Sequence, residues 1–447
     1  MTTAKSSGGS PSTFIPNTDD DQRAMLDAIG VADFEELITD VPESHRYPAL
    51  NLPEAAHEMS LAAEMAGLAA SNFVPGDYAC FLGSGAYRHY VPAVARKVAN
   101  RGEFMTSYTP YQPEVAQGSL QVAFEFQTMV SHLMGLPVAN AGMYDGPTAF
   151  AEAALMAARL TKRTKVIALD TVDERNIEVS RSYSHYQGIE IVRASASDLS
   201  VPDDAACVMV QSPNVNGVIE DMAAISTAAH ASGALAVASV NPMSLGMFKS
   251  PGECDVDIAT GEGQPLGVPL GFGGPYVGLF TCKDELKRQL PGRIVGKTTD
   301  TNGETGYVLT LQTREQHIRR ERATSNICTS TQLIALMVAA YLATLGKQGL
   351  RETAELCYQK AHYAASQIDA LDGYSLASEG TFFNEFVISC RESVQTTLGA
   401  LIEHKIIGGT DASERAPNGI VFALTEQNSR AEIDRLVAAL GEIGSTS

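Results

Sequence analysis

The most constraining feature of this sequence is a series of short apolar segments in its middle third, each bounded by polar or turn-forming residues. Four of them are expected to be strands: 165–170 (KVIALD), 189–192 (IEIV), 206–210 (ACVMV) and 234–238 (ALAVA). The stretches between them, such as 221–232, are long enough for helices. Apolar strands that alternate with helices typically form a parallel sheet covered on both faces. The sequence therefore predicts an α/β domain with a mainly parallel sheet.

Changes in this pattern along the 447 residues predict four regions. They are a disordered tail (1–13), an N-terminal helical segment (14–75), a large α/β domain (76–330) and a small C-terminal α+β domain (331–447). In the helical segment, Asn51 followed by Pro53 and Glu54 predicts a helix start, because proline fits the first turn. The last region is expected to begin with two helices and to continue with alternating strands and helices (331–346, 351–371, 383–389, 394–404, 420–424 and 429–440).

Composition limits the possible functions. Acidic residues outnumber basic ones by 52 to 32, and a net charge of −20 repels nucleic acid and anionic membranes. We expect no membrane segment, since no run of about 18 apolar residues occurs, and no signal peptide, since the first residues lack an apolar stretch. Seven scattered cysteines without C-x-x-C spacing predict reduced thiols in the cytoplasm, and nine histidines without H-x-x-x-H spacing predict no metal site.

The segment 143–149 (MYDGPTA) leads into an Ala-rich stretch, 150–160, that is expected to be a helix. Free N–H groups at a helix start can bind an anion, and Gly146 would let a phosphate approach closely. Asp145, Gly146 and Thr148 are therefore candidates for a phosphate cup. Asp145 or Thr148 could instead cap an ordinary helix, and the spacing alone favours this second interpretation.

A second candidate is the loop 107–118 (SYTPYQPEVAQG), in which two prolines three residues apart stiffen an extended backbone. Tyr108, Thr109, Tyr111 and Gln112 place several hydrogen-bonding groups on this rigid frame, as binding loops often do. A surface loop pinned by buried tyrosines explains the same residues equally well.

Two further segments have unusual compositions. Residues 260–275 contain six glycines and three prolines but match no glycine-rich phosphate motif, so nucleotide binding is not indicated. Residues 312–329 contain four arginines that alternate with two glutamates (Arg314, Glu315, Arg319, Arg320, Glu321, Arg322). This alternation favours a solvated segment with weak internal ion pairs. Contact of one of these arginines with an anion is the alternative.

Together these segments resemble the glycine dehydrogenase (decarboxylating) family, the P-protein of the glycine cleavage system. The matching stretches are FIPN (14–17), YTPYQPE (108–114) with Gln117 and Gly118, MYDGPT (143–148), GEGQPLG (261–267), QTREQHIR (312–319) and ATSNICT (323–329). Members of the family with two homologous halves on one chain are much longer. This chain is similar to the first half only, which the split form of the family carries as a separate subunit 1.

The resemblance implies a fold of the pyridoxal-phosphate (PLP)-dependent transferase type, that of aspartate aminotransferase (fold type I). Such an enzyme holds PLP as a Schiff base on a lysine of the large domain. Here the comparable stretch, 255–263, contains no lysine, and none occurs between Lys249 and Lys283. The strand end 236–241 also offers Ala and Ser where an aspartate would meet the pyridine nitrogen. We therefore expect no covalently held PLP; a stand-alone PLP enzyme that uses Lys249 or Lys283 is a weaker alternative.

The activity that the resemblance implies belongs to a complex. PLP on subunit 2 decarboxylates glycine, and the aminomethyl group passes to the lipoylated H-protein, in an expected α2β2 heterotetramer. This chain would have no catalytic residues in isolation. Its candidate contributions are the loop residues at the subunit interface and a vestigial phosphate cup (Tyr108, Thr109, Tyr111, Gln112; Asp145, Gly146, Thr148). The alternative is a purely structural subunit that stabilises its partner and docks the H-protein.

Overall fold

The computed structural model describes residues 17–327 and 331–445. The family-like stretches FIPN and ATSNICT therefore lie partly outside the described residues. Contacts within the chain define two units, with the boundary in the sequence between Asn72 and Phe73, and each is described separately.

The first unit is a series of short helices: α1 (Asp19–Ile29), η1 (Phe34–Ile38), η2 (Glu43–His45) and α2 (Glu58–Ala69). No residue of these four helices is buried. The predicted start of a helix at Asn51 is wrong, because residues 51–57 are not helical and α2 begins after His57. The good helix formers Glu54, Ala55 and Ala56 lie outside the helix, so helix propensity alone does not set its start.

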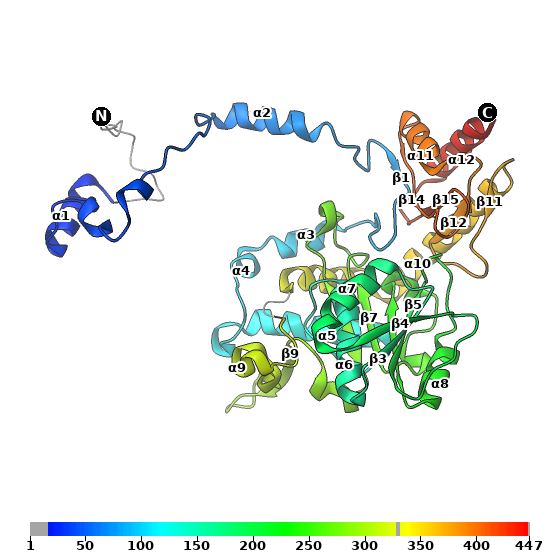
Figure 1. The fold of residues 1–447 in the computed structure, drawn as a ribbon, viewed down its shortest axis with the longest axis horizontal. Coiled ribbons are helices and arrows are strands. Elements are labelled where there is room, and N and C mark those ends of the chain that lie inside the picture. The colour runs from blue at the N-terminus through cyan, green and yellow to red at the C-terminus, as the bar shows by residue number, and fades with distance from the viewer. Residues whose placement is uncertain (1–16, 328–330, 446–447) are drawn as a thin grey trace. The chain divides into compact units, whose positions relative to one another are not determined.

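The second unit is built on a seven-stranded sheet with the order β2-β8-β7-β6-β5-β3-β4. Figure 1 labels its strands β3, β4, β5 and β7. Its strands are β2 (Val138–Ala139), β3 (Lys165–Leu169), β4 (Glu190–Ala194), β5 (Ala205–Ser212), β6 (Leu235–Val240), β7 (Ile258–Glu262) and β8 (Gly278–Cys282). Strands β3 to β7 pair in parallel, whereas β8 is antiparallel to β7 and to β2. The four strands expected from the sequence are present, so the predicted mainly parallel α/β sheet is confirmed.

Four helices accompany this sheet: α5 (Gln117–Met134), α6 (Gly146–Thr161), α7 (Glu174–Ser184) and α8 (Met222–Ala231). Helix α6 is buried at every position from Ala149 to Ala158. Its many alanines allow it to lie close to β5, β6, β7 and β8, all of which it contacts. This close packing brings the first residue of α6 to the carboxyl end of β7.

The C-terminal part of the chain forms a four-stranded antiparallel sheet with the order β11-β12-β15-β14. Its strands are β11 (Ser375–Leu376), β12 (Glu385–Ser389), β14 (Thr410–Asp411) and β15 (Gly419–Ala423), and its helices are α11 (Val394–Glu403) and α12 (Arg430–Ser445). A short strand from much earlier in the chain, β1 (Ala79–Cys80), pairs in parallel with β13 (Ile406–Ile407). As a result, Ala79 and Phe81 lie in the same apolar core as Phe386 and Phe422.

One long helix, α10 (Gln332–Asp369), joins the two cores. The sequence predicts two helices here, and a kink at Gly346 (φ 61°, ψ −173°), a conformation that glycine tolerates, does divide α10 into two helical segments. By length and composition alone the helix could cross a membrane. However, Val338 and Tyr341 pack in the core of the large sheet and Ile368 packs in the C-terminal core, as in a core helix of a globular protein.

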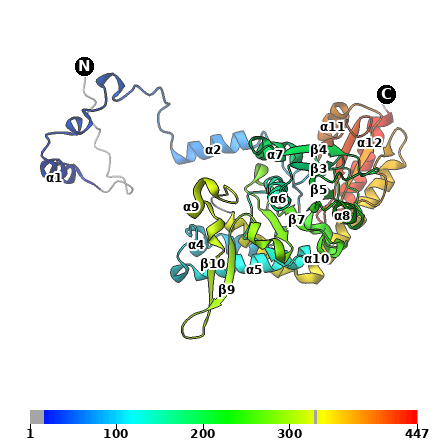
Figure 2. The ribbon, with the colours of Figure 1, turned by 60° about the horizontal axis from the view of Figure 1, so that its bottom comes forward.

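The remaining elements include a hairpin and three short helices. Strands β9 (Ile294–Thr299) and β10 (Thr305–Thr310) form the antiparallel hairpin, and the helices are α3 (Ala93–Ala99), α4 (Gly102–Met105) and α9 (Gln316–Arg319). Figure 2 places the hairpin, α4 and α9 on the same side of the second unit, as does Figure 1.

Candidate functional site

A cavity of about 290 Å³ lies at the carboxyl ends of the parallel strands. Gln211 of β5, Ser239 of β6 and Glu262 of β7 line it. Residues from the other core, including Tyr87, Glu385 and Arg415, close its opposite side. Ligands of open α/β sheets typically bind at this edge, so the cavity is the position where a cofactor of this fold would be expected.

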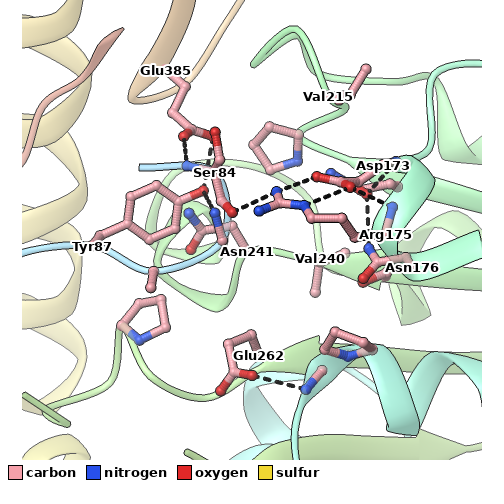
Figure 3. A pocket seen from close by; sticks show the side chains of 18 of the residues that line it. Ser84, Tyr87, Asp173, Arg175, Asn176, Val215, Val240, Asn241, Glu262 and Glu385 are labelled. Atoms are coloured by element: carbon pink, nitrogen blue, oxygen red, sulfur yellow. Dashed lines mark hydrogen bonds and ion pairs between the residues drawn. The ribbon is translucent and has the colours of Figure 1, made fainter. Parts of the chain in front are cut away.

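The start of α6 forms one wall of the cavity, as the phosphate-cup prediction requires. Asp145 is the N-cap residue: its Oδ1 accepts a hydrogen bond from the Thr148 N–H (2.8 Å), and the Thr148 hydroxyl completes a capping box. The Gly146 N–H donates to Glu262 Oε2 at 2.9 Å (Figure 3). A carboxylate of the chain itself therefore takes the place at the helix N-terminus where an external anion would bind.

The approach to this helix start is also closed by backbone. A Cβ atom built on Gly146 would lie 2.9 Å from Glu262 Cβ and 3.0 Å from its backbone nitrogen. Burial raises the pKa of Glu262 to about 7, although N–H groups of Gly146 and Gln264 hydrogen-bond its carboxylate. Asp145, Gly146 and Thr148 are thus brought together as predicted, but Asp145 and Thr148 bond each other and Gly146 binds Glu262.

Other charged groups of the cavity also have hydrogen-bond partners within the chain. Arg175 forms an ion pair with Asp173 and donates to the Ser84 carbonyl oxygen at 2.8 Å. Glu385 accepts a hydrogen bond from the Tyr87 hydroxyl (2.8 Å), and burial raises the pKa of both groups. Arg415 donates to the Val215 carbonyl oxygen at 2.9 Å. Figure 3 shows this internal network around the cavity.

The residues present do not fit covalently held PLP. The described residues that line the cavity include no lysine. Lys283 forms ion pairs with Asp255 and Asp257, both at 2.7 Å, and neither it nor Lys249 lines the cavity. Ser239 occupies the end of β6, where the sequence also lacked an aspartate.

Several lining residues were not among those singled out from the sequence. Glu262 belongs to the glycine-rich segment 260–275, where its neighbours suggested only a tight turn. Arg175 and Glu385 come from segments without a functional motif. Besides the neighbouring Asp173, the Arg175 side chain contacts Ser84, 91 residues away, and Glu385 contacts Tyr87, 298 residues away. No sequence spacing connects such residues, so they could not have been found without the fold.

The predicted binding loop lies elsewhere: none of Tyr108, Thr109, Tyr111 or Gln112 lines this cavity. Tyr108 and Gln112 are exposed, Tyr111 is 43% exposed, and Thr109 is half-buried. The loop makes a tight turn in which the Tyr111 N–H donates to the Thr109 carbonyl oxygen at 2.8 Å. The interpretation of this loop as pinned by buried tyrosines is wrong for Tyr108 and Tyr111.

The arginine-rich segment is only partly solvated. Arg314 and Glu315 are buried beside each other, with 3.4 Å between Nη2 and Oε1, and Arg314 also donates to the Gly292 carbonyl oxygen at 2.8 Å. The expectation of a wholly solvated segment is wrong for these two residues. Arg319, Arg320 and Arg322 are exposed, as expected.

One group of possible metal ligands occurs among the described residues: His89, Cys357 and Glu426. His89 Nδ1 and Glu426 Oε2 are 2.7 Å apart. Two ligands of one tetrahedral zinc ion lie about 3.3 Å apart, because each bond is about 2.0–2.1 Å long. The shorter distance is that of a charge-assisted hydrogen bond, and we interpret this group as a structural contact between segments 337 residues apart.

Comparisons with known proteins agree with this geometry. A family model described as "Glycine cleavage system P-protein" matches residues 12–440. The chain is 48% identical over 443 residues to "Probable glycine dehydrogenase (decarboxylating) subunit 1" of Desulfitobacterium hafniense, covering 96% of this chain and 99% of that one. It is 46% identical to the protein of the same name from Thermomicrobium roseum, with the same coverage.

Solved structures give the same result. A glycine decarboxylase (P-protein) in inhibitor-bound form superposes with a TM-score of 0.91 at 42% identity, covering 96% of this chain and 99% of that one. A sphingosine-1-phosphate lyase of Burkholderia pseudomallei, 15% identical with a TM-score of 0.62 over 90% of this chain and 94% of that one, shares the fold alone. The chain belongs to the glycine cleavage system P-protein family, and over nearly its full length it is similar to the subunit 1 form of glycine dehydrogenase (decarboxylating).

Proposed function

We propose that this chain is the cofactor-free subunit of a two-subunit glycine decarboxylase. Its partner, subunit 2, holds PLP; the complex releases the carboxylate of glycine as CO2 and passes the aminomethyl group to the lipoyl arm of the H-protein. The complex is an α2β2 heterotetramer in the cytoplasm. The relatives' name, subunit 1, supports the existence of a second subunit.

The observation that carries this proposal is the contact between Glu262 and Gly146. In a working site the N–H groups at this helix start would be available to a cofactor phosphate, but here a side chain of the protein uses the first of them. A site that has lost its anion cradle and offers no lysine is not a PLP site of its own. The chemistry must then be supplied by another chain.

When bound to subunit 2, PLP supplies an electron sink for decarboxylation. The contribution of the present chain is the stiff loop that carries Tyr108, Thr109, Tyr111 and Gln112. The loop keeps its polar groups outside its own cavity, where a partner surface can meet them. There it binds and orients the reacting molecule and helps to exclude water from the partner's pocket.

A purely structural subunit, which would stabilise subunit 2 and dock the H-protein, is the second candidate. The self-paired charges of the cavity favour it, because the cavity in this chain needs no ligand to satisfy Arg175, Glu262 or Glu385. The two candidates differ in what the loop does. Removal of its polar groups lowers turnover of the intact complex under the first candidate and leaves it unchanged under the second.

The experiment for the proposed function is an absorption spectrum between about 320 and 450 nm, recorded with PLP before and after borohydride. It is recorded for the chain alone, for subunit 2 alone and for the mixture. We expect a reducible chromophore only where subunit 2 is present, and glycine-dependent CO2 release only in the mixture. A reducible chromophore on this chain alone would contradict the proposal, and full activity of subunit 2 alone would favour a structural role.

A further inference from the structure

Three segments of the chain meet at the ring of Tyr111. Arg293, which precedes β9, donates a hydrogen bond from Nη2 to the Tyr111 hydroxyl oxygen at 3.3 Å, and its guanidinium carbon lies 5.4 Å from the ring centre. The ring of His317, from α9, is 5.2 Å from the ring of Tyr111. Two of the segments singled out from the sequence, 107–118 and 312–329, are therefore joined through one tyrosine.

The hydrogen bond from Arg293 determines what Tyr111 can offer to a ligand. Because the hydroxyl oxygen accepts from Arg293, the hydroxyl proton remains available to donate. His317 is exposed, so the N–H of its imidazole can donate beside the tyrosine. Two donors at the edge of one exposed aromatic pair can hold an oxygen-bearing anion.

The surrounding charges favour an anion as well. Glu315 is buried with Arg314, and Glu321 is 3.7 Å from Arg322. Within the part of the chain that the structure describes, Arg319 and Arg320 form no ion pair with a carboxylate. This patch is thus locally positive on a chain whose net charge is −20. A positive patch on an acidic protein attracts anions to that position.

The backbone holds these groups in place. Arg314 donates from Nη2 to the carbonyl oxygen of Gly292, and this hydrogen bond fixes the residue that precedes Arg293. Leu311 (φ 53°) and Arg320 (φ 54°) have positive φ on either side of His317. Non-glycine residues in this region are strained, and such strain often occurs at binding sites.

We propose that Tyr111 and His317, with Arg293 positioning Tyr111, bind the anionic oxygen group of the molecule that reacts in the active site of subunit 2. The group is a carboxylate if it belongs to the substrate amino acid, or a phosphate if it belongs to the cofactor. The proposal rests on the proposed function, since it places this patch at the interface with the cofactor-bearing subunit. Tyr111 and His317 are binding residues, and Arg293 is a positioning residue that acts through Tyr111.

The test uses the complete complex with subunit 2, H-protein and PLP, and compares His317→Asn and Tyr111→Phe with the unmodified chain. His317→Asn removes the imidazole from an exposed position, so folding should be preserved. His185→Asn is the matched control, because His185 is also exposed and forms a ring pair with Tyr186, at 4.6 Å. The measurements are KM and kcat for glycine, Kd for PLP from absorption, and assembly by analytical ultracentrifugation.

We expect His317→Asn and Tyr111→Phe to change the same binding constant by roughly tenfold, the usual effect of losing one charge-assisted hydrogen bond. A higher KM for glycine with unchanged Kd for PLP identifies the substrate carboxylate, and a higher Kd for PLP identifies the phosphate. Unchanged constants in an active, assembled complex overturn the proposal, as does an equal effect of His185→Asn. A change in assembly alone also overturns it. An unmodified complex that shows no activity overturns the proposed function together with this inference.

Discussion

The N–H group of Gly146 and the carboxylate of Glu262 are 2.9 Å apart, although 116 residues separate them in the chain. Through this contact the end of β7 supplies an acceptor to the start of α6, a position at which an external anion could otherwise bind. The contact explains how the chain can keep the fold of an enzyme while the start of α6 is satisfied by a side chain of the protein itself.

Replacement of Glu262 by glutamine should change how stability depends on pH. The folded pKa of Glu262 is raised to about 7 by burial from a usual value of 4.5, so the folded protein binds more protons than the unfolded chain between these values. Stability from this group is present below about pH 4.5 and is lost as pH rises through about 7. Glutamine does not titrate. As pH rises through this range, we therefore expect the free energy of unfolding of Glu262→Gln to fall by on the order of 2–3 kcal/mol less than that of the unmodified chain.

Urea denaturation at intervals between pH 5 and about pH 8 measures this effect. Glu385 is also buried with a raised pKa, so the quantity of interest is the difference between the variant and the unmodified chain at each pH. A constant difference across this range would contradict the role assigned to Glu262.

Changes in the loop separate the catalytic contribution from a structural one. Tyr111→Phe and Gln112→Ala should each lower turnover of the assembled complex at least tenfold, because each removes a polar group from the loop that we place in the partner's active site. Tyr186→Phe is the control, since Tyr186 is 94% exposed and far from this loop in sequence. Unchanged turnover in both loop variants would favour the structural subunit.

The buried pair of Arg314 and Glu315 should matter more for stability than an exposed pair. Arg314→Met removes the hydrogen bond to the Gly292 carbonyl oxygen and leaves the Glu315 carboxylate buried beside no cation. We expect a loss of about 3 kcal/mol in the free energy of unfolding. Adding Glu315→Gln to this variant should recover part of the loss, and urea denaturation of both variants measures it. Equal stability of the single and double variants would show that the two side chains do not interact.

The contact between His89 and Glu426 should not depend on a metal. Burial raises the pKa of the Glu426 carboxyl, but hydrogen bonds from His89 and from the Tyr90 N–H outweigh it and leave the pKa lowered. The stability from Glu426 is therefore present above its unfolded pKa and is lost as pH falls through the lower folded value. Glu426→Gln should destabilise the protein by about 1–2 kcal/mol near neutral pH and much less in acid.

Zinc provides the complementary measurement at this group. Because the two ligand atoms are only 2.7 Å apart, we expect no rise in the melting temperature when Zn²⁺ is added. A clear rise in Tm that disappears in Cys357→Ala would instead identify a metal site.

The sequence predicted local elements well where one local rule determined them. The segment 165–170 became β3 and the segment 221–232 became α8, with Asp221 as its cap, because an apolar run or a capping residue needs only its neighbours. The start of α2 was wrong, since the pattern at Asn51 and Pro53 had no packing to support it. The boundary between the predicted helices 331–346 and 351–371 was right, because a kink at Gly346 divides α10 into two helical segments.

For the candidate site, the sequence predicted the residues on one side of the cavity but not those on the other side. Asp145, Gly146 and Thr148 were predicted from their position at a helix start, and the capping box has the predicted form. The occupant of that helix start, Glu262, gave no signal in a glycine-rich segment. The loop around Tyr111 and the segment 312–329 that carries His317 were both singled out from the sequence, but their contact through Tyr111 and the part of Arg293 were not.

The sequence by itself determined the parallel α/β sheet, the family and the absence of a lysine from the segment where the cofactor would need one. These follow from apolar patterns, from long matching motifs and from the identity of single residues, all of which are local in the chain. Only the tertiary structure decided that Glu262 closes the helix start at Gly146 and that Tyr111, Arg293 and His317 meet on one surface. Such contacts join residues that lie more than a hundred positions apart in the sequence. Which of these residues come close in space is set by the packing of the whole core.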